Sequence, residues 1–403
     1  MRFNPILIIL SCISCYEKQW VKDCETRSYD TPEIQWFSSY NGSEEESHGH
    51  FIKSLSDGSF LQIGETGFVH NLSSKILIIK VDSNGDLIWK KEISSSGINM
   101  GNSIIEMDEG YLISCSIDDD SALILLDKFN GEIIFSSQFD NGGSDAYEHS
   151  ISFGDTIASV GYYDADDRKN TFYTEGKGIL SFHDEKGIKN YDVDLSIYIS
   201  QAYRIKKYKE FLYISGLSYG AEDYTLIKTN LKGEIIWKKS YGGERNDHNF
   251  GMDINDIGEI FLTGHTLSGT QNWDTYTIKV DLEGNKIWES VVGNPRGFNP
   301  KYIHDEVWGI KNTPDGGCII VAGTGDEYED YNRTCSNTNQ NSSIWNVYLI
   351  KFMNDGQIDW EVTYGNKSLG NWAGEDIDLT DDGGAIIAVD NGEFGFLKIQ
   401  SFN

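Results

Sequence analysis

Leu77-Ile-Ile-Lys-Val-Asp-Ser-Asn-Gly-Asp-Leu-Ile-Trp89 combines a β-forming run, a turn with glycine, two apolar residues and a tryptophan. The same phrase returns as Leu226-Ile-Lys-Thr-Asn-Leu-Lys-Gly-Glu-Ile-Ile-Trp237 and as Thr277-Ile-Lys-Val-Asp-Leu-Glu-Gly-Asn-Lys-Ile-Trp288. An aromatic residue ends comparable phrases at Trp36, Trp89, Phe135, Tyr191, Trp237, Trp288 and Trp360. A recurrence at about 50 residues is typical of a repeat architecture that forms one domain.

Each unit of the repeat contains four short β-like runs. In the first full unit these are residues 51–55, 59–65, 75–82 and 86–93, with turn signals at Asp57-Gly58 and Asn84-Gly85 between them. Such Asp-Gly and Asn-Gly pairs supply the positive φ that tight hairpins need. A four-stranded sheet cannot bury both of its faces alone, but stacking against neighbours around a ring covers them. The units are therefore predicted to be the blades of a propeller.

The two ends of the chain predict how the ring closes. The seventh copy ends with the run Phe394 to Phe402 and lacks its aromatic strand, which is found instead at Glu33 to Gly42 with Trp36. Pairing these two segments removes the open edges that a linear array would leave. We therefore expect residues 33–403 to be all-β and to form a seven-bladed β-propeller. Its four-stranded antiparallel blades are closed by pairing the N-terminal strand with the C-terminal blade.

The spacing Asp-x-x-Gly-x-x-x-Trp, seen at Asp82, Gly85 and Trp89, resembles the tryptophan-docking repeat of the quinoprotein-dehydrogenase-like (PQQ-like) propellers. The resemblance implies that the seven recurring aromatic residues dock between adjacent blades. The dehydrogenases of that family have eight blades and an adjacent Cys-Cys pair beside the quinone, whereas this chain has seven units and no such pair. The resemblance thus favours the exported, non-enzymatic branch, and no PQQ cofactor is expected.

The N-terminus predicts export. Residues 1–12 contain a short apolar run ending in Ile9-Leu10-Ser11-Cys12, which resembles a lipoprotein signal with Cys12 as the lipidated residue. The alternative is an ordinary cleaved secretory signal. Residues 13–32 would then be a linker. The expected location is the cell envelope as a lipoprotein, or the periplasm or exterior as a free protein, with membrane contact only through the lipid.

Four further cysteines lie in the chain beyond Cys12 and the nearby Cys15. Cys115 and Cys318 lie in strand-like runs, where buried thiols are expected. Cys24 precedes the first repeat and Cys335 lies in an insertion before the last one, regions that a closed ring brings near each other. A Cys24–Cys335 disulfide is permitted in an export compartment, and two separate thiols are the alternative.

Charge excludes one class of partner. The chain has 63 acidic and 33 basic residues and a formal net charge of -30. This charge repels phosphate backbones, so no nucleic-acid partner is expected. A monomeric propeller with an unidentified protein or glycan partner is the expectation.

The loops between blades carry the polar residues from which a site could be built. The candidates for a ligand-binding face are His48, His149, Asp247, His248, His304, Asp305, Glu306, Trp372 and Glu375. Imidazoles and carboxylates together suit a divalent cation or a polar ligand. The alternative is that these side chains cap strand starts and the turns between blades. No residues have a dedicated metal-ligand spacing, so no metal ligand is assigned.

Two functional hypotheses follow. In the first, the protein is an exported scaffold that binds a protein, a glycan or another polymer at its loop face. In the second, it is a hydrolase or lyase that uses histidines and carboxylates around the channel, with or without a divalent cation. The sequence contains no nucleophile and base at a recognisable spacing, so no catalytic residue is assigned.

Overall fold

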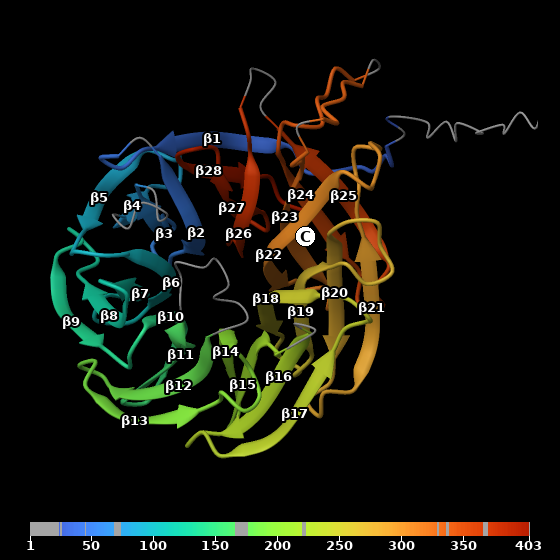
Figure 1. Cartoon of the computed structure of the whole chain (residues 1–403). Helices are drawn as coiled ribbons and strands as arrows, with labels where there is room; N and C mark the ends of the chain where they lie inside the picture. Colours follow the sequence, from blue (N-terminus) through green and yellow to red (C-terminus); the bar gives the residue numbers. More distant parts are fainter. Residues whose placement is uncertain are drawn as a thin grey trace, which may run out of the picture.

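The fold is a closed ring of sheets. The computed structural model describes residues 24, 26–44, 46–67, 74–165, 176–219, 223–328, 330–335, 338–365 and 370–402. These residues form seven four-stranded antiparallel sheets around a central axis (Figure 1). Within the described part, no helix is long and apolar enough to cross a membrane. The predicted seven-bladed, all-β propeller is confirmed.

The strands of each blade follow one another from the axis outward. Blade one consists of β2 (Ser47–Ser54), β3 (Phe60–Thr66), β4 (Lys75–Val81) and β5 (Leu87–Ile93). Blade two consists of β6 (Met100–Glu106), β7 (Tyr111–Ile117), β8 (Asp120–Leu126) and β9 (Ile133–Phe139). Blade three consists of β10 (Ser144–Phe153), β11 (Thr156–Ala165), β12 (Lys177–Asp184) and β13 (Lys189–Asp194). Blade four consists of β14 (Gln201–Tyr208), β15 (Phe211–Leu217), β16 (Tyr224–Asn230) and β17 (Ile235–Tyr241). Blade five consists of β18 (Asp247–Ile254), β19 (Ile260–Thr266), β20 (Asp274–Val280) and β21 (Lys286–Val292). Blade six consists of β22 (Ile303–Asn312), β23 (Cys318–Asp326), β24 (Asn346–Phe352) and β25 (Ile358–Tyr364). Blade seven consists of β26 (Ala373–Leu379), β27 (Ala385–Asp390), β28 (Phe394–Ile399) and β1 (Ile34–Tyr40).

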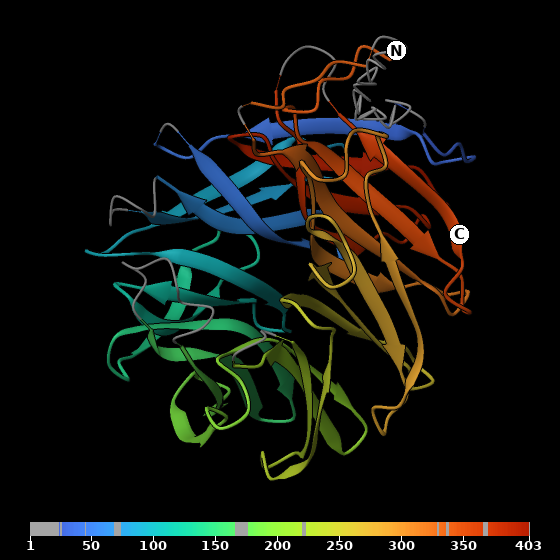
Figure 2. The same ribbon diagram turned by 45° about the vertical axis from the view of Figure 1, so that its right-hand side comes forward.

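Blade seven is built from both ends of the chain. Strand β1 runs antiparallel to β28, with Trp36 opposite Lys398 and Tyr40 opposite Phe394. In Figure 2 the blue β1 lies across the red strands of this blade. Phe37 of β1 stacks on Trp372, with ring centroids 4.1 Å apart. The N-terminal strand therefore closes the ring as the split repeat predicted.

The recurring aromatic residues lie against the glycine turn of the next blade. Gly85 has a φ of 85°, and a Cβ built on it would lie 2.7 Å from the Trp36 ring. Comparable close contacts join Trp89 to Gly131, Phe135 to Gly187, Trp237 to Gly284, and Trp288 to Gly356. Glycine is thus needed twice in this motif, for the left-handed turn and for the approach of the ring. Tyr191 differs, because it stacks on Phe182 of its own blade and is 45% exposed.

A buried lysine faces the docking residue wherever that residue is tryptophan. The pairs across the two outer strands are Lys80 with Trp89, Lys228 with Trp237, Lys279 with Trp288, Lys351 with Trp360, and Lys398 with Trp36. Each of these ammonium groups pairs with an acidic residue, in the manner of Lys80 with Asp57 at 2.8 Å. In the blades that carry Phe135 and Tyr191, the opposite residues are Leu125 and Phe182. Lysine and tryptophan therefore occur as a unit.

Replacing Lys279 by leucine is expected to lower the free energy of unfolding by about 1–3 kcal/mol, because the buried acceptors lose their donor. Its Nζ lies 2.7 Å from a Glu259 oxygen and 3.4 Å from the Gly316 carbonyl oxygen. The double variant Lys279→Leu/Trp288→Phe reproduces the Leu-Phe type of pair found in blade two. It should cost less than the sum of the two single variants in urea unfolding. If the two single losses in unfolding free energy add up to that of the double variant, Lys279 and Trp288 are not coupled.

Every innermost strand carries a β-bulge at the same place. The extra residues, each skipped in the pairing of the first two strands of its blade, are His50, Asn102, Glu148, Tyr203, Phe250, Trp308 and Glu375. A bulge changes the direction of a side chain and leaves its residue outside the regular hydrogen bonds between the two strands. Rings of neighbouring blades touch here, with Phe250 4.8 Å from Tyr203 and 4.3 Å from Trp308. The fold thus presents one variable residue per blade near the axis.

The segment before β1 is fastened to blade six. Cys24 and Cys335 form a disulfide, with Cα atoms 5.8 Å apart, and Cys115 and Cys318 are buried free thiols. Arg27 pairs with Glu361. The described residues 26–32 of the proposed linker thus run along the propeller. Cys12, the signal segment 1–12 and residues 13–23 lie outside the described residues.

Candidate ligand cleft at the loop face

A cleft opens where blades six, seven and one meet. It lies on the face of the ring where innermost strands begin and second strands end, which we call the loop face. Its volume is about 440 Å³, and its lining residues are Glu46, His48, Glu306, Glu327, Trp345, Asn371, Ala373, Asp390, Asn391 and Gly392. Four of these carry carboxylates, and none of these lining residues of the described chain is lysine or arginine. The cleft is therefore an acidic site.

His48 is held in the cleft by two carboxylates from different blades. Its Nδ1 lies 2.9 Å from an Asp390 oxygen, and its Nε2 lies 3.7 Å from a Glu46 oxygen. The hydrogen bond to Asp390 raises the pKa of His48 to about 9, against the opposing effect of burial. His48 is thus an imidazolium at neutral pH, and the pair fixes its orientation.

The bulge residues His50 and Glu375 extend this cluster toward the axis. His50 Nε2 lies 2.5 Å from a Glu65 oxygen. Burial alone would lower the pKa of His50, but the Glu65 carboxylate outweighs burial and raises it to about 9. Burial, with the neighbouring charge of Asp390, raises the pKa of Glu375 to about 8. At neutral pH the carboxyl group of Glu375 is therefore mostly protonated.

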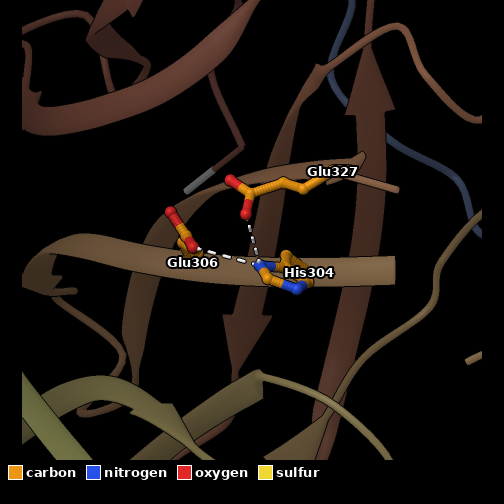
Figure 3. A group of neighbouring side chains, drawn as sticks. All are labelled: His304, Glu306 and Glu327. Atoms are coloured by element: carbon orange, nitrogen blue, oxygen red, sulfur yellow. Dashed lines mark hydrogen bonds and ion pairs between the residues drawn. The ribbon is translucent and has the colours of Figure 1, made fainter. Parts of the chain in front are cut away.

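On the blade-six side, one histidine and two glutamates converge (Figure 3). His304 Nδ1 lies 3.4 Å from an oxygen of Glu306 and 3.4 Å from an oxygen of Glu327. All three candidate ligand atoms lie within 4.8 Å of one another. Imidazole and carboxylate donors suit several divalent cations. This side of the cleft has the donor types for a cationic ligand, whether a metal ion or an organic cation.

Trp345 provides an aromatic wall for the cleft. Its ring lies on the backbone of β23, where a Cβ added to Gly325 would lie 2.4 Å from the ring, and one added to Gly323 would lie 3.0 Å from it. The Trp345 backbone N–H donates to the Asn371 side chain at 3.0 Å. The glycines leave space for the ring, and the hydrogen bond fixes the chain behind it. An aromatic ring is thus held beside four carboxylates.

Two of the sequence candidates cap turns between blades. Asp247 accepts a hydrogen bond from the Gly243 N–H at 2.7 Å. Asp305 accepts one from the Asn294 N–H, also at 2.7 Å, and burial raises its pKa to about 6. These contacts match the capping alternative that the sequence left open.

Three other candidates lie away from the cleft. His149 is buried deeper along the axis beside Arg204. His248 belongs to an aromatic group with Trp273, whose ring centroid is 4.8 Å away. Trp372 is buried against the closing strand. The cleft thus brings together only His48 and Glu306 from the sequence candidates in its lining, with His304 and Glu375 directly behind them.

Several residues of the site were not singled out from the sequence. Asp390 and Glu65 end second strands of their blades, a repeat position that also holds His265 and could have been compared across units. Glu327 and Trp345 flank the insertion of blade six, between β23 and β24. Insertions follow no period, so no pattern in the sequence indicated these two residues.

Comparisons with known proteins support the fold and identify no family. The sequence matches no protein-family model. No curated relative matches it. Among solved structures, a catalytically inactive variant of virginiamycin B lyase from Staphylococcus aureus with quinupristin is similar, with a TM-score of 0.56, 10% identity, and coverage of 90% of this chain and 99% of that chain.

Two further solved structures show the same likeness. Drosophila plexin A in complex with semaphorin 1b has a TM-score of 0.52 and 9% identity, with coverage of 93% and 88% of the two chains. The WD40 domain of Neurospora crassa Pan2 has a TM-score of 0.51 and 11% identity, with coverage of 83% and 86%. At such identities the shared feature is the β-propeller. This fold commonly serves as a scaffold for interactions.

Proposed function

We propose that this protein is an exported binding propeller whose loop-face cleft receives a positively charged side chain of a protein partner. The observation that carries the proposal is the cleft lining, in which four carboxylates surround Trp345 without any lysine or arginine among its described lining residues. Carboxylates and an aromatic face together bind ammonium and guanidinium groups. The net charge of -30 adds long-range attraction for such a partner.

The protonation states favour binding over proton-transfer catalysis. A general base must be unprotonated at the working pH. His48 and His50, with pKa values of about 9, are charged at neutral pH, and Glu375, with a pKa of about 8, is mostly protonated. The two imidazoles and the Glu375 carboxyl group are therefore poorly suited to accept a proton at neutral pH. The alternative of a hydrolase or lyase has less support than that of a binding site.

Export is part of the proposal. The Cys24–Cys335 disulfide supports it, because such bonds persist in oxidising compartments. The lipobox-like segment before Cys12 supports a lipid anchor, and the docking repeat supports kinship with the non-enzymatic PQQ-like propellers. Labelling with palmitate in the native cell would test the anchor.

The binding proposal is tested with a lysine-rich peptide and a neutral Gly/Ser peptide in isothermal titration calorimetry. The cleft variant Glu46→Gln/Glu306→Gln/Glu327→Gln removes three exposed or half-buried charges. Each such charge contributes up to about 1 kcal/mol, so binding of the basic peptide should weaken roughly tenfold or more. The control variant Asp108→Asn/Glu109→Gln/Asp381→Asn removes three charges from turns that join an innermost strand to the second strand of its blade, on the opposite face.

The control variant should bind almost as the wild type does. Equal weakening in both variants would show attraction to net charge alone and would contradict a site in the cleft. Binding of Ca²⁺ or Mn²⁺ without binding of the basic peptide would replace the proposal with a metal site at His304, Glu306 and Glu327.

A further inference from the structure

A second, smaller cavity lies deeper along the axis than the cleft. Its volume is about 20 Å³. This is room for one water molecule or one small ion. The side chains of His149, Arg204, Lys206, Lys311 and Asp376 line it, together with the backbone at Gly251 and Gly309. We call it the throat cavity.

Cations outnumber acids around the throat cavity. Lys206 Nζ lies 2.9 Å from an Asp253 oxygen, and Lys311 Nζ lies 3.2 Å from an Asp378 oxygen. A second lysine, Lys53, shares Asp378 at 2.5 Å. Two carboxylates thus form ion pairs with three ammonium groups, in a protein that is otherwise strongly acidic.

Arg204 adds a fourth positive charge. Within the described residues its guanidinium donates a hydrogen bond to the Tyr203 carbonyl oxygen, at 3.0 Å, and forms no ion pair. The carboxylate of Asp376, the third acid, accepts the Ile52 backbone N–H at 3.0 Å. Of the charged side chains that line the cavity, Arg204, Lys206 and Lys311 are cations and Asp376 is an acid, while Lys53, Asp253 and Asp378 lie next to them.

His149 contributes an unused polar atom at the same place. Its side chain is buried, with 5% of the residue exposed, and its Nδ1 has no hydrogen-bond partner among the described residues. Burial and the nearby charges of Arg204, Lys206 and Lys311 hold the pKa of His149 well below its usual range. A neutral imidazole carries one N–H, so Nδ1 can donate into the cavity as one tautomer. A buried polar atom without a partner is costly, which favours a ligand at this point.

We propose that the throat cavity binds one small inorganic anion of the chloride class, held by Arg204, the excess lysine charge and Nδ1–H of His149. The anion balances the surplus positive charge and accepts a hydrogen bond from the His149 imidazole. It contacts blades three, four and six at once and thereby stabilises the packing of the innermost strands around the axis. This site is separate from the acidic cleft and does not depend on the function proposed for it.

The test compares thermal unfolding in sodium chloride and in sodium gluconate at equal ionic strength. A ligand that binds only the folded state raises Tm, here by roughly 2 °C or more in chloride. The variants Arg204→Gln and His149→Phe should lose the chloride-specific part of this rise. Lys232→Gln, which removes an exposed cation far from the axis, should keep it.

Bromide soaked into crystals of the wild-type protein gives an independent readout. An anomalous peak in the throat cavity is expected, and this readout holds even where the Arg204 variant does not fold. Equal Tm in the two salts for the wild type, together with bromide absent from the cavity, would overturn the proposal. A chloride effect that is the same in Arg204→Gln and the wild type would overturn it as well.

Discussion

A chain that lacks residues 1–40 is expected to lose the cooperative fold. Strand β1 supplies the outer strand of blade seven and the side chains Trp36, Phe37 and Tyr40, which are each partly buried. Fully burying one large apolar side chain contributes roughly 1.5–3 kcal/mol, so three partly buried ones contribute several kcal/mol, a large share of the roughly 5–15 kcal/mol that stabilises a whole domain. The deletion also leaves β28 as an open edge. Circular dichroism and urea unfolding would measure the loss.

A circular permutant provides the matched control. The Gln400 N–H donates to the Glu33 carbonyl oxygen at 2.9 Å, so a short turn can join Phe402 to Glu33. A chain that starts at Asn41 and carries residues 33–40 after this turn keeps every β1 contact. Because it lacks Cys24 and its disulfide, it should fold with stability close to that of the Cys24→Ser/Cys335→Ser variant. If the deletion folds as stably as the permutant, β1 does not close the ring.

Removing the disulfide with Cys24→Ser/Cys335→Ser is expected to cost about 3–5 kcal/mol, because the bond closes a very long loop in the unfolded chain. The two residues are 311 positions apart. In the folded protein they lie in a small buried cluster with Phe298, Ile303 and Tyr331. The bond therefore ties the segment that leads into β1 to blade six.

Urea unfolding of the wild type with and without reductant checks this prediction. Reductant should lower the midpoint of the wild type and leave the double-serine variant unchanged. A wild-type midpoint that does not respond to complete reduction would contradict a stabilising role.

The repeat in the sequence predicted most of the fold. Glycine turns such as Gly85 and the aromatic residues such as Trp89 occur at fixed spacing, so blade number and ring closure could be predicted from one chain. The lysine opposite each docking tryptophan stands at a constant position, but its pairing with the ring follows only from the register of the two outer strands. The bulges were not visible, because a bulge is defined by the pairing of two strands. The exposure of an apolar side chain also depends on the place of its strand in the blade. Ile88 is apolar yet 48% exposed, because it lies on an outermost strand.

Of the residues that line the candidate cleft, the sequence indicated His48 and Glu306. His48 follows β1 and Glu306 lies in blade six, and closing the ring brings both to blade seven. Asp247 and Asp305 are also acidic, yet they cap turns, because their carboxylates accept hydrogen bonds from the nearby backbone N–H groups of Gly243 and Asn294. Glu327 and Trp345 could not be placed, since their positions depend on an insertion without repeat symmetry.

Photo-cross-linking of a lysine-rich peptide to the wild-type protein, with mass-spectrometric mapping of the sites, tests the binding claim most directly. We expect cross-links at residues 46–48, 304–306, 371–373 and 390–392, which border the cleft. We also expect them to disappear in the Glu46→Gln/Glu306→Gln/Glu327→Gln variant. Cross-links spread over the outermost strands, or concentrated at turns of the opposite face, would contradict the loop-face cleft as the binding site.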